Sequence, residues 1–588
     1  MKKIPIALLM IILLYLICNN SHALAGDTYN IAATPKAEVA SWSPATPDTS
    51  SPPRLRTSLK CGEDTKTTFN KSGVEVLPFL RTAFFDMDGD GRQELIAGSK
   101  DGSLRFYKNS GTVNNPSWNL TEKYFEDISA GAFSSPAVGD IDGCGRPEII
   151  LGTGGFSSDS GRVLLYKNSG SIDRPVWKKM DLPKIWVGND ATPALLDVDN
   201  DGKPDLIVGN STGNLFLFRN LSKDKRVLFE KDPNYFKGIN LGMYGMPAAT
   251  TAGDGTSIII AGNSMGKLYI LEKGPGQKSF SQKTGLRISL NSFAAPSFIK
   301  TGDKESDIVI SDSYGQFHLF KNRKNNYREW EKSPDFLDGR VLAGPVCSPG
   351  RVDIGRRSLM VVGNINGQIK LFEYKPSSNK LPWVERPDFF KNIKLRGFSR
   401  GVLANWEGKE LLITGQQDGV IKAFLNSGTM DRPQWVEKKA FFTSIPKMMH
   451  AAPSVFDIDG DGRWELIVGD ADGNVRGFRY KTVSKGMPVW ESLREGFSNV
   501  KVGRFATPTI VKDSDRLILF VGEQDGRIHV FTADSTRPGT PVFYNADYLP
   551  DIRVNNHSSP SAVAKDGLIE LMIGDYNGNL KHFACRKD

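Results

Sequence analysis

The sequence predicts an all-β fold, a β-propeller of about ten four-stranded blades, and three observations lead to this prediction. A glycine that ends a short apolar run recurs every 49 to 57 residues, with Ser311 in one of its ten places. Each interval holds short strand-like segments separated by glycine turns, and the first nine carry an aromatic residue near their end. Repeats of this length without helical periodicity are typical of propeller blades. The ten positions are Gly98, Gly152, Gly209, Gly262, Ser311, Gly363, Gly415, Gly469, Gly522 and Gly574.

Within a repeat, the first strand runs into an acidic turn, as in SSPAVGDIDG and AAPSVFDIDG. The second is a continuous apolar run such as ELIAG or DLIVG, which suits a strand covered on both faces. A turn such as KDG or STG follows, because glycine tolerates the positive φ of a tight hairpin. The third strand resembles SLRFYKN or NLFLFRN. The fourth carries the aromatic residue, at Trp118, Trp177, Phe229, Phe280, Trp330, Trp383, Trp435, Trp490 and Phe543.

The N-terminus predicts an exported protein. Two lysines, an apolar run and the sequence Ala-Leu-Ala before Gly26 are the parts of a signal peptide, here residues 1–25. A lipoprotein modified at Cys18 is less favoured, because Ile17 is larger than the residue that usually precedes a lipid-attachment cysteine. Residues 26–66 are rich in Thr, Ser and Pro and are expected to be a flexible spacer. No later run reaches the roughly 18 apolar residues of a membrane helix, so a soluble periplasmic, cell-surface or secreted chain is expected.

Residues 67–588 are expected to form the propeller. The tenth repeat stops after its third strand, NLKHFACRKD, and the segment TTFNKSGVEVL from Thr67 is expected to supply the missing fourth strand, with Phe69 in the aromatic position. Nothing between neighbouring repeats resembles a linker. We therefore favour one closed ring of ten blades over two smaller rings.

The repeat also predicts a disulfide between Cys61 and Cys585. An asparagine ends the third strand seven residues after the turn glycine, and Cys585 stands seven residues after Gly578. That asparagine precedes the fourth-strand aromatic by eight or nine residues, and Cys61 precedes Phe69 by eight. The two cysteines therefore map to one point of the blade, and an exported chain meets an oxidising compartment. Cys144 and Cys347 are expected to stay unpaired.

The chain resembles the FG-GAP/VCBS repeat family, the bacterial relatives of the integrin alpha-subunit propeller. The resemblance rests on the phrase D-x-D-x-D-G-x-x-[DE]-L, the following L-I-V-G, and the F-x-x-P entry to each blade, as from Phe133 to Pro136. It covers roughly residues 67 to 585 and implies a propeller. The family includes adhesins, lectin-like binders and accessory domains of enzymes, so the resemblance does not fix one function.

The acidic phrase predicts calcium sites that are not EF-hands. An EF-hand needs a bidentate Glu at loop position 12 and a following helix, whereas position 12 here is Ala97, Val208 or Val468. What remains is a nine-residue loop with carboxylates at positions 1, 3, 5 and 9 and a carbonyl at 7, an arrangement that the family resemblance also implies. Acidic hairpin turns without a metal are disfavoured, since such close carboxylates repel one another. The predicted ligands are Asp86, Asp88, Asp90, the Arg92 carbonyl and Glu94; Asp197, Asp199, Asp201, the Lys203 carbonyl and Asp205; and Asp457, Asp459, Asp461, the Arg463 carbonyl and Glu465.

A fourth loop keeps Asp140, Asp142 and Glu148 but has Cys144 at position 5, and a thiol is a poor calcium ligand. Whether this loop binds Ca²⁺ stays open. The other six repeats lack the phrase, so calcium is expected to stabilise some blades.

No catalytic motif is present, and no HExxH, GxSxG, CxxCH or phosphate-binding glycine loop occurs. His450 and His557 share one repeat position, which holds Phe133 or Phe505 elsewhere and should ring one end of a channel. Packing between blades and a binding mouth are both open readings of this ring. Lys and Arg are scattered, so a solvated surface is favoured over attraction to an anionic polysaccharide, and nucleic acid is not an expected partner.

The sequence therefore predicts an exported, calcium-stabilised propeller that acts as a non-catalytic binding, adhesion or assembly module, with a protein or polysaccharide partner at the cell surface. The alternative is a secreted calcium-dependent polysaccharide lyase or glycosidase. It would need acids, Lys, Tyr or His converging on one rim, and the dense carboxylates are those assigned to metal. A quinone-dependent dehydrogenase propeller is disfavoured, because its tryptophan docking repeats are missing.

Overall fold

The structure is a computed structural model. It describes residues 59–64, 74 and 79–587, apart from interior gaps at 129–130, 156–159, 183, 224–225, 284–285, 287, 289, 291–292, 303–304, 314, 334–342, 345, 377–381, 485–486, 537–539, 547–551, 555 and 566. The predicted signal peptide and most of the predicted spacer lie outside these residues. The only helical element described is the 3₁₀ turn η1 (Glu495–Phe497). No helix in the described part of the chain is long and apolar enough to cross a membrane.

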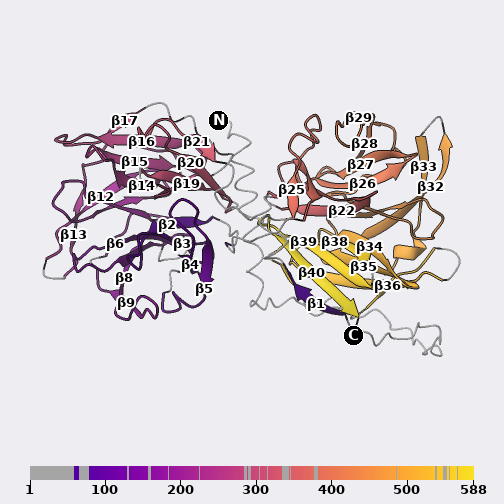
Figure 1. Cartoon of the computed structure of the whole chain (residues 1–588), viewed down its shortest axis with the longest axis horizontal. Helices are drawn as coiled ribbons and strands as arrows, with labels where there is room; N and C mark the ends of the chain where they lie inside the picture. Colours follow the sequence, from indigo (N-terminus) through magenta and orange to yellow (C-terminus); the bar gives the residue numbers. More distant parts are fainter. Residues whose placement is uncertain are drawn as a thin grey trace, which may run out of the picture. The chain divides into compact units, whose positions relative to one another are not determined.

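The forty strands form ten four-stranded antiparallel sheets, which confirms the predicted all-β fold and ten blades (Figure 1). Blades are numbered in chain order, and the first strand of each is its inner strand. Blade 1 contains β2 (Arg81–Phe85), β3 (Glu94–Gly98), β4 (Leu104–Asn109) and β5 (Trp118–Thr121); blade 2 contains β6 (Ser135–Gly139), β7 (Glu148–Gly152), β8 (Val163–Asn168) and β9 (Trp177–Met180); blade 3 contains β10 (Thr192–Leu196), β11 (Asp205–Gly209), β12 (Leu215–Asn220) and β13 (Phe229–Asp232); blade 4 contains β14 (Met246–Thr251), β15 (Ser257–Gly262), β16 (Leu268–Lys273) and β17 (Ser281–Lys283); blade 5 contains β18 (Ala295–Ile299), β19 (Asp307–Ser311), β20 (Phe317–Lys321) and β21 (Glu331–Ser333).

The remaining blades repeat this order, and the last of them borrows a strand from the N-terminus. Blade 6 contains β22 (Ser348–Ile354), β23 (Arg357–Gly363), β24 (Ile369–Tyr374) and β25 (Trp383–Glu385); blade 7 contains β26 (Arg400–Trp406), β27 (Lys409–Gly415), β28 (Ile421–Asn426) and β29 (Trp435–Glu437); blade 8 contains β30 (Ala452–Phe456), β31 (Glu465–Gly469), β32 (Val475–Ser484) and β33 (Met487–Ser492); blade 9 contains β34 (Thr507–Asp513), β35 (Arg516–Gly522), β36 (Ile528–Asp534) and β37 (Tyr544–Asn545); blade 10 contains β38 (Ser559–Lys565), β39 (Leu568–Gly574), β40 (Leu580–Lys587) and β1 (Leu59–Glu63).

The blades form two closed five-bladed rings, so the expectation of a single ten-bladed ring is wrong. The inner strands make contact in the order β2, β6, β10, β14 and β18, and β18 returns to β2. A second circuit runs through β22, β26, β30, β34 and β38 and closes on β22. At the first closure the Ser297 hydroxyl donates to the Thr82 carbonyl (2.6 Å). Blades 1–5 are called the first propeller and blades 6–10 the second propeller.

The recurring glycine marks where neighbouring blades touch. A Cβ atom at Gly98 would overlap the Ser134 carbonyl of blade 2, and the other repeat glycines meet the next blade in the same way. At Gly574 the overlapping carbonyl is that of Cys347, so blade 10 adjoins blade 6. Ser311, which replaces the glycine in blade 5, donates its hydroxyl to the Leu80 carbonyl at 2.7 Å. The contact made at this repeat position therefore identifies the neighbouring blade at both ring closures.

The N-terminal strand completes blade 10, as predicted, but it lies earlier in the sequence than expected. β1 pairs with β40 and places Cys61 opposite Cys585. In blade 1 the same register places Asn109 opposite Trp118, so Cys61, and not Phe69, stands in the aromatic position. The predicted spacer boundary at residue 66 is therefore too late, and Phe69 lies outside the described residues. The first ring closes without a strand from elsewhere in the sequence, because every strand of blades 1–5 comes from one continuous stretch.

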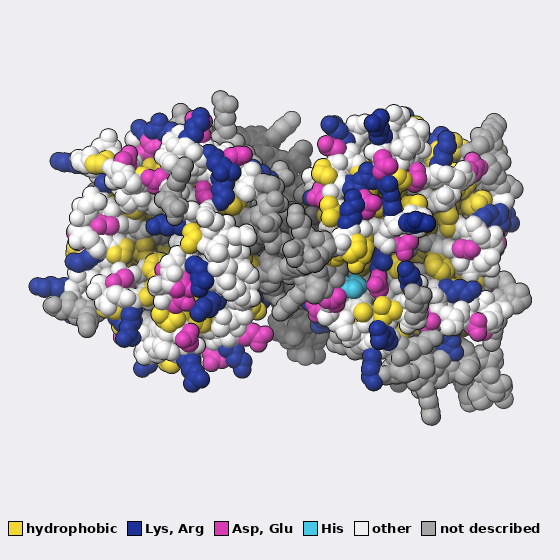
Figure 2. Space-filling model, viewed as in Figure 1, with side chains coloured by type: hydrophobic (Ala, Val, Ile, Leu, Met, Phe, Trp, Pro, Cys, Tyr) yellow, Lys and Arg dark blue, Asp and Glu magenta, His cyan; other side chains and the backbone are white. Residues whose placement is uncertain are grey.

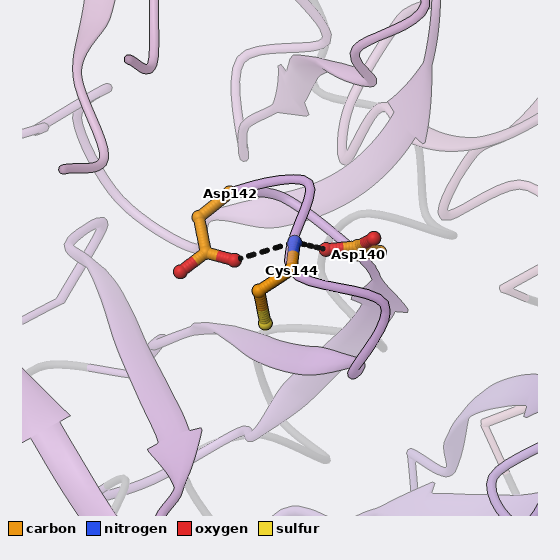
Figure 3. A group of neighbouring side chains, drawn as sticks. All are labelled: Asp140, Asp142 and Cys144. Atoms are coloured by element: carbon orange, nitrogen blue, oxygen red, sulfur yellow. Dashed lines mark hydrogen bonds between the residues drawn. The ribbon is translucent and has the colours of Figure 1, made fainter. Parts of the chain in front are cut away.

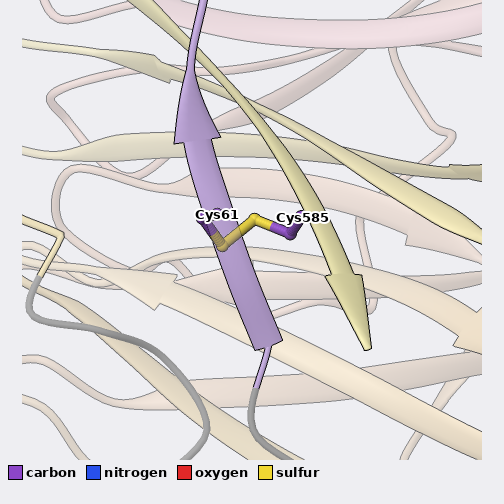
Figure 4. Close-up of a disulfide and its surroundings, with 2 residues drawn as sticks. All are labelled: Cys61 and Cys585. Carbon is purple, nitrogen blue, oxygen red and sulfur yellow. A yellow bond between two sulfur atoms is a disulfide. The ribbon is translucent and has the colours of Figure 1, made fainter. Parts of the chain in front are cut away.

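Cys61 and Cys585 are joined by the expected disulfide, with an S–S distance of 2.09 Å and a Cα–Cα distance of 4.0 Å (Figure 4). Cys144 and Cys347 are free. The disulfide thus fastens the strand that closes the second propeller.

The core lies between adjacent blades. The second strands, such as β3, β7 and β11, are buried at every residue, as their continuous apolar runs predict. Three fourth-strand tryptophans, Trp177, Trp435 and Trp490, donate their indole N–H groups to carbonyls of the segment that follows the preceding blade. The Trp177 bond, to the Tyr124 carbonyl, is 3.1 Å long. Each blade therefore buries its apolar faces only with a neighbour on both sides, which a closed ring provides.

Candidate metal centres

The four acidic loops join the first and second strands of blades 1, 2, 3 and 8. In each loop the first aspartate organises the turn by accepting backbone N–H groups. Asp86 Oδ2 accepts from Gly91 N at 2.9 Å, and Asp457 Oδ2 accepts from Gly462 N at 2.9 Å. Gly91 has φ +83°, a conformation that favours glycine. The D-x-D-x-D-G phrase is thus a hairpin signal and a carboxylate cluster at once.

The structure brings together three candidate ligands in each loop, with their ligand atoms within 4.8 Å of one another. Some predicted ligands stay outside these groups. Asp461 lies against the Arg463 guanidinium, and Asp90 contacts Arg92 in the same way while remaining in its group. The predicted ligands outside the groups are Glu94, Glu148, Asp201 and Asp461. The groups are Asp86, Asp88 and Asp90; Asp140, Asp142 and Cys144; Asp197, Asp199 and Asp205; and Asp457, Asp459 and Glu465.

The acid at position 9 is buried in every loop. Glu94 is 1% exposed, and its Oε2 accepts from Met87 N at 2.9 Å. Burial, with a smaller contribution from neighbouring Asp88, raises the pKa of Glu94 to about 7 against the effect of this hydrogen bond. Burial likewise raises the pKa of Glu465 to about 7 and that of Asp205 to about 6. A buried carboxylate beside other carboxylates is an environment that a bound cation would stabilise.

Sequence reasoning missed a basic side chain at each loop. The basic residue directly precedes the position at the end of the third strand that Asn109 occupies in blade 1. Its side chain lies against the aspartate at loop position 3. Lys108 Nζ is 3.0 Å from Asp88 Oδ2, and Arg479 Nη2 is 2.7 Å from Asp459 Oδ2. A signal was available: this position is Lys or Arg in the four repeats that carry the acidic phrase and in blade 5. The five residues are Lys108, Lys167, Arg219, Lys321 and Arg479.

Blade 5 has the basic residue in a loop that lacks the acidic phrase. Its loop has lost the phrase, yet Lys321 Nζ lies 3.0 Å from Asp307 Oδ2, at position 9, and also contacts Thr301 at position 3. The basic side chain lies within 4 Å of the buried acid in blades 2, 3 and 8, and it does so in blade 5 without the other carboxylates.

The donor chemistry in blades 1, 3 and 8 fits Ca²⁺, which prefers hard oxygen ligands in flexible numbers. In blade 1 Asp86, Asp88 and Asp90 would hold the ion, with Glu94 in the same loop. In blades 3 and 8 the position-9 acid takes the place of the position-5 aspartate in the group. A bound Ca²⁺ would neutralise the carboxylates and tie the end of the first strand to the start of the second. The carbonyls of Arg92, Lys203 and Arg463 belong to the same loops and remain predicted ligands.

The loop of blade 2 fits less well. Its Cys144 N–H donates to both Asp140 Oδ1 (2.9 Å) and Asp142 Oδ1 (3.1 Å), which holds the two carboxylates around the cysteine backbone (Figure 3). Burial and the neighbouring Asp142 raise the pKa of the Cys144 thiol, which keeps it protonated. Lys167 contacts Asp142 and lies 3.3 Å from Glu148 Oε1. A protonated thiol and a paired lysine leave fewer oxygens for a metal.

A second feature lies at the opposite ends of the blades, where the chain enters each inner strand. One residue per blade, called the entry residue, has a positive φ between 32° and 62° and is half-buried. Non-glycine residues rarely adopt this conformation, so packing must hold it. The entry residues are Phe79, Phe133, Asp190, Tyr244 and Phe293 in the first propeller and Val346, Phe398, His450, Phe505 and His557 in the second.

Entry residues contact one another around each ring. In the second propeller, His450 lies between Phe398 and Phe505, with ring centroids 4.8 Å apart on both sides. Phe505 in turn contacts His557 at 5.1 Å. Burial lowers the pKa of His557 to about 4, with His450 and Arg504 lowering it further. The predicted ring of aromatic and imidazole groups is thus present.

Comparison with known proteins identifies the repeat. A family model described as an FG-GAP-like repeat matches residues 86–151, and one described as an FG-GAP repeat matches residues 190–221. A search of curated proteins finds no significant match.

Three of the solved structures that match the chain have low sequence identity to it. An ancestral GH74 enzyme is 12% identical, with 87% of this chain and 75% of that chain covered and a TM-score of 0.45. A six-bladed fucose-binding lectin from Aleuria aurantia is 11% identical, with coverage of 58% and 91% and a TM-score of 0.29. An exo-1,5-alpha-L-arabinanase from a bovine ruminal metagenomic library is 14% identical, with coverage of 41% and 93% and a TM-score of 0.29.

Proposed function

The chain is an FG-GAP-type repeat protein, and from this premise we propose that it is an exported, calcium-stabilised and non-catalytic binding module. Its partner is a protein or polysaccharide at the cell surface or in the periplasm. The binding surface is the entry side of the propellers, which carries the entry residues and the turns between second and third strands.

The distribution of exposed apolar side chains carries this proposal. The four most exposed large hydrophobic residues of the described chain are Trp186, Met243, Met265 and Met449, which are 52–64% exposed. All four lie on the entry side. Met243 and Met449 directly precede entry residues, and the Met243 carbonyl accepts from Ser264 N in the turn that holds Met265 (2.9 Å). Exposed methionines and tryptophan rimmed by polar residues are typical of binding surfaces.

The acidic loops lie at the other ends of the inner strands and therefore face away from this surface. An ion bound in these loops would hold strands together without touching a partner on the entry side, which is consistent with the proposed stabilising role of calcium. Among the described residues, all groups of three or more acidic or thiol side chains with metal-ligand spacing belong to these loops, which supports a non-catalytic role. Figure 2 shows basic and acidic side chains interspersed over the face that it displays, in keeping with a solvated surface.

The test combines a glycan array with pull-downs from the native cell envelope. Met243→Gln combined with Met265→Gln should weaken binding to any partner found by at least tenfold, without changing the melting temperature. Leu120→Gln is the matched control: Leu120 is 40% exposed, but it lies on the outer strand β5. Equal binding by the double variant and the control would refute the entry-side surface, and turnover of a bound glycan would refute the non-catalytic role.

A further inference from the structure

Each propeller places one arginine at the same position of an inner strand. Arg81 pairs with Gly98 at the start of β2, and Arg400 pairs with Gly415 at the start of β26. The other blades have smaller or uncharged residues there: Ser135, Thr192, Met246, Ala295, Ser348, Ala452, Thr507 and Ser559. This position of the inner strand therefore places one guanidinium group in each propeller.

The first propeller supplies its own counter-charge. Burial lowers the pKa of Arg81 to about 10, and Asp190 and Tyr244 act against this by favouring its charged form. Asp190 is an entry residue, two blades along the ring from Arg81, and its Oδ1 also accepts from Gly155 N at 2.8 Å. Asp190 therefore offsets part of the cost of burying the Arg81 charge, although no ion pair between the two is described.

Arg400 in the second propeller has no such partner. It is 5% exposed and reaches across the ring to blades 9 and 10. Its Nη1 donates to Ser559 Oγ (3.0 Å), and its Nη2 donates to the carbonyls of Pro508 and Pro560 (both 3.1 Å). All three acceptors are neutral, and no described carboxylate pairs with it. Burial alone lowers its pKa to about 10.

An uncompensated buried charge is costly unless something pairs with it. A guanidinium has five N–H groups in a planar fork, and three hydrogen bonds to neutral oxygens leave two N–H groups without an acceptor among the described residues. This fork matches the geometry of a carboxylate, sulfate or phosphate group.

Arg400 also lines an open cavity of about 340 Å³ whose wall is formed by the inner strands of all five blades of the second propeller. Three of the lining residues are basic, Arg351, Arg400 and Lys512, and none is acidic. Arg351 is paired with Glu570, which leaves Arg400 as the buried cation without a counter-ion. Hydroxyls of Ser454, Thr509 and Ser561 complete the polar part of the wall.

We propose that the channel of the second propeller is a binding site for a small oxyanion, a carboxylate or a sulfate or phosphate group, held by Arg400. None of the predicted metal ligands and none of the four exposed entry-side hydrophobic residues lines this cavity. A cavity of this size admits a ligand as large as a sugar acid. The ligand supplies in the second propeller what Asp190 supplies in the first.

The test titrates the full-length protein with sodium sulfate and with galacturonate, by calorimetry and thermal shift at constant ionic strength. Galactose lacks the carboxylate and is the neutral control, and sodium chloride controls for general salt effects. At least one of the two oxyanions should bind saturably and raise the melting temperature, and the preferred probe distinguishes a carboxylate site from a sulfate site. No saturable response beyond that of chloride to either probe overturns the proposal.

Two variants of opposite design test the role of Arg400. Arg400→Gln removes the cation. Phe505→Asp instead places a carboxylate at the entry residue two blades along from Arg400, as Asp190 is from Arg81, and so supplies an internal anion. Both should weaken oxyanion binding at least tenfold. If Arg400→Gln does not fold, Phe505→Asp still decides the matter.

Arg396→Gln is the matched control, since it removes the same charge from a side chain that is 86% exposed in the same propeller. It should change the dissociation constant less than twofold. Unchanged oxyanion binding by folded Arg400→Gln or Phe505→Asp, or an equal loss in Arg396→Gln, would show that surface charge and not the channel binds the anion.

Discussion

At the scale of single residues, Asp459 connects the acidic loop to its surroundings. It lies in a group with Asp457 and Glu465 and also contacts Arg479. If calcium binds this loop only in the folded state, a hundredfold excess over the dissociation constant adds about 2.7 kcal/mol to stability. Chelation with EGTA should therefore lower the melting temperature of the wild-type protein, and Asp459→Ala should shrink that response. Identical melting curves with calcium and with chelator would contradict the assignment.

The basic residue beside each loop predicts a second effect. A cation that binds near Asp459 must displace or share the contact with Arg479, whose Nε is also 3.5 Å from Glu465 Oε1. Arg479→Gln should therefore tighten calcium binding severalfold, as measured by calorimetry, because like charges no longer compete. Lys321→Gln is the control, since Lys321 pairs with Asp307 in a loop without the acidic phrase. A weaker calcium response in Arg479→Gln would show that the arginine organises the loop.

His557 predicts a dependence of stability on pH. Its folded pKa, about 4, lies below the ordinary value of 6.5, and the groups that face it are His450, Arg504, Phe505 and Tyr576. The unfolded chain therefore takes up this proton first, so stability is complete above pH 6.5 and is lost as the pH falls towards 4.

His557→Phe tests this dependence, and phenylalanine already fills the same position in five other blades. The variant should retain up to about 3 kcal/mol that the wild type loses over this range. Chemical denaturation at pH 7.5 and pH 4.5 measures it. Parallel losses in both proteins would assign the acid sensitivity to other groups.

At the scale of elements, the pairing of β1 with β40 replaces an Asn–aromatic pair by a disulfide. Reduction, or Cys61→Ser combined with Cys585→Ser, removes a cross-link across a sequence separation of 524 residues. In the chain-entropy model such a link contributes on the order of 5 kcal/mol. Calorimetry should show a lower melting temperature for the second propeller alone, because the first propeller contains neither cysteine. A fall in both transitions would mean that the two rings unfold together.

At the scale of the whole molecule, the chain begins in the second propeller with β1, forms all of the first propeller, and then returns. The first propeller uses only the continuous stretch from β2 to β21, so a fragment of residues 71–342 should fold alone and melt cooperatively by circular dichroism. A fragment of residues 343–588 lacks β1 and exposes the edge of β40, which is a template for aggregation. It should elute as oligomers or melt at a lower temperature than the second transition of the full chain. A monomeric fragment of full stability would show that β1 is dispensable.

Much of this architecture follows from local sequence patterns. Buried runs such as ELIVG, the turn glycines and the fourth-strand aromatics each act within about fifty residues, and they predicted ten blades without any tertiary information. The acidic loops were equally readable, because Asp86 and its counterparts order the turn through their own backbone N–H groups. The cysteine pairing was found for a similar reason, since the repeat maps Cys61 and Cys585 to one place in a blade.

Ring size was decided only in the tertiary structure. Whether blade 5 meets blade 6 or blade 1 depends on a few contacts far apart in sequence, such as Ser311 with Leu80 and Ser297 with Thr82, and any blade offers similar surfaces to either neighbour. The strand that closes blade 10 was misplaced for a related reason, because β1 was aligned by an aromatic residue when a cysteine had taken that position. The roles of Arg400 and Lys108 were not predicted, because they depend on the groups that face these side chains across a channel or a hairpin. Local chemistry therefore determined the blades and their loops, and long-range packing determined how many blades share a ring and which charges meet inside it.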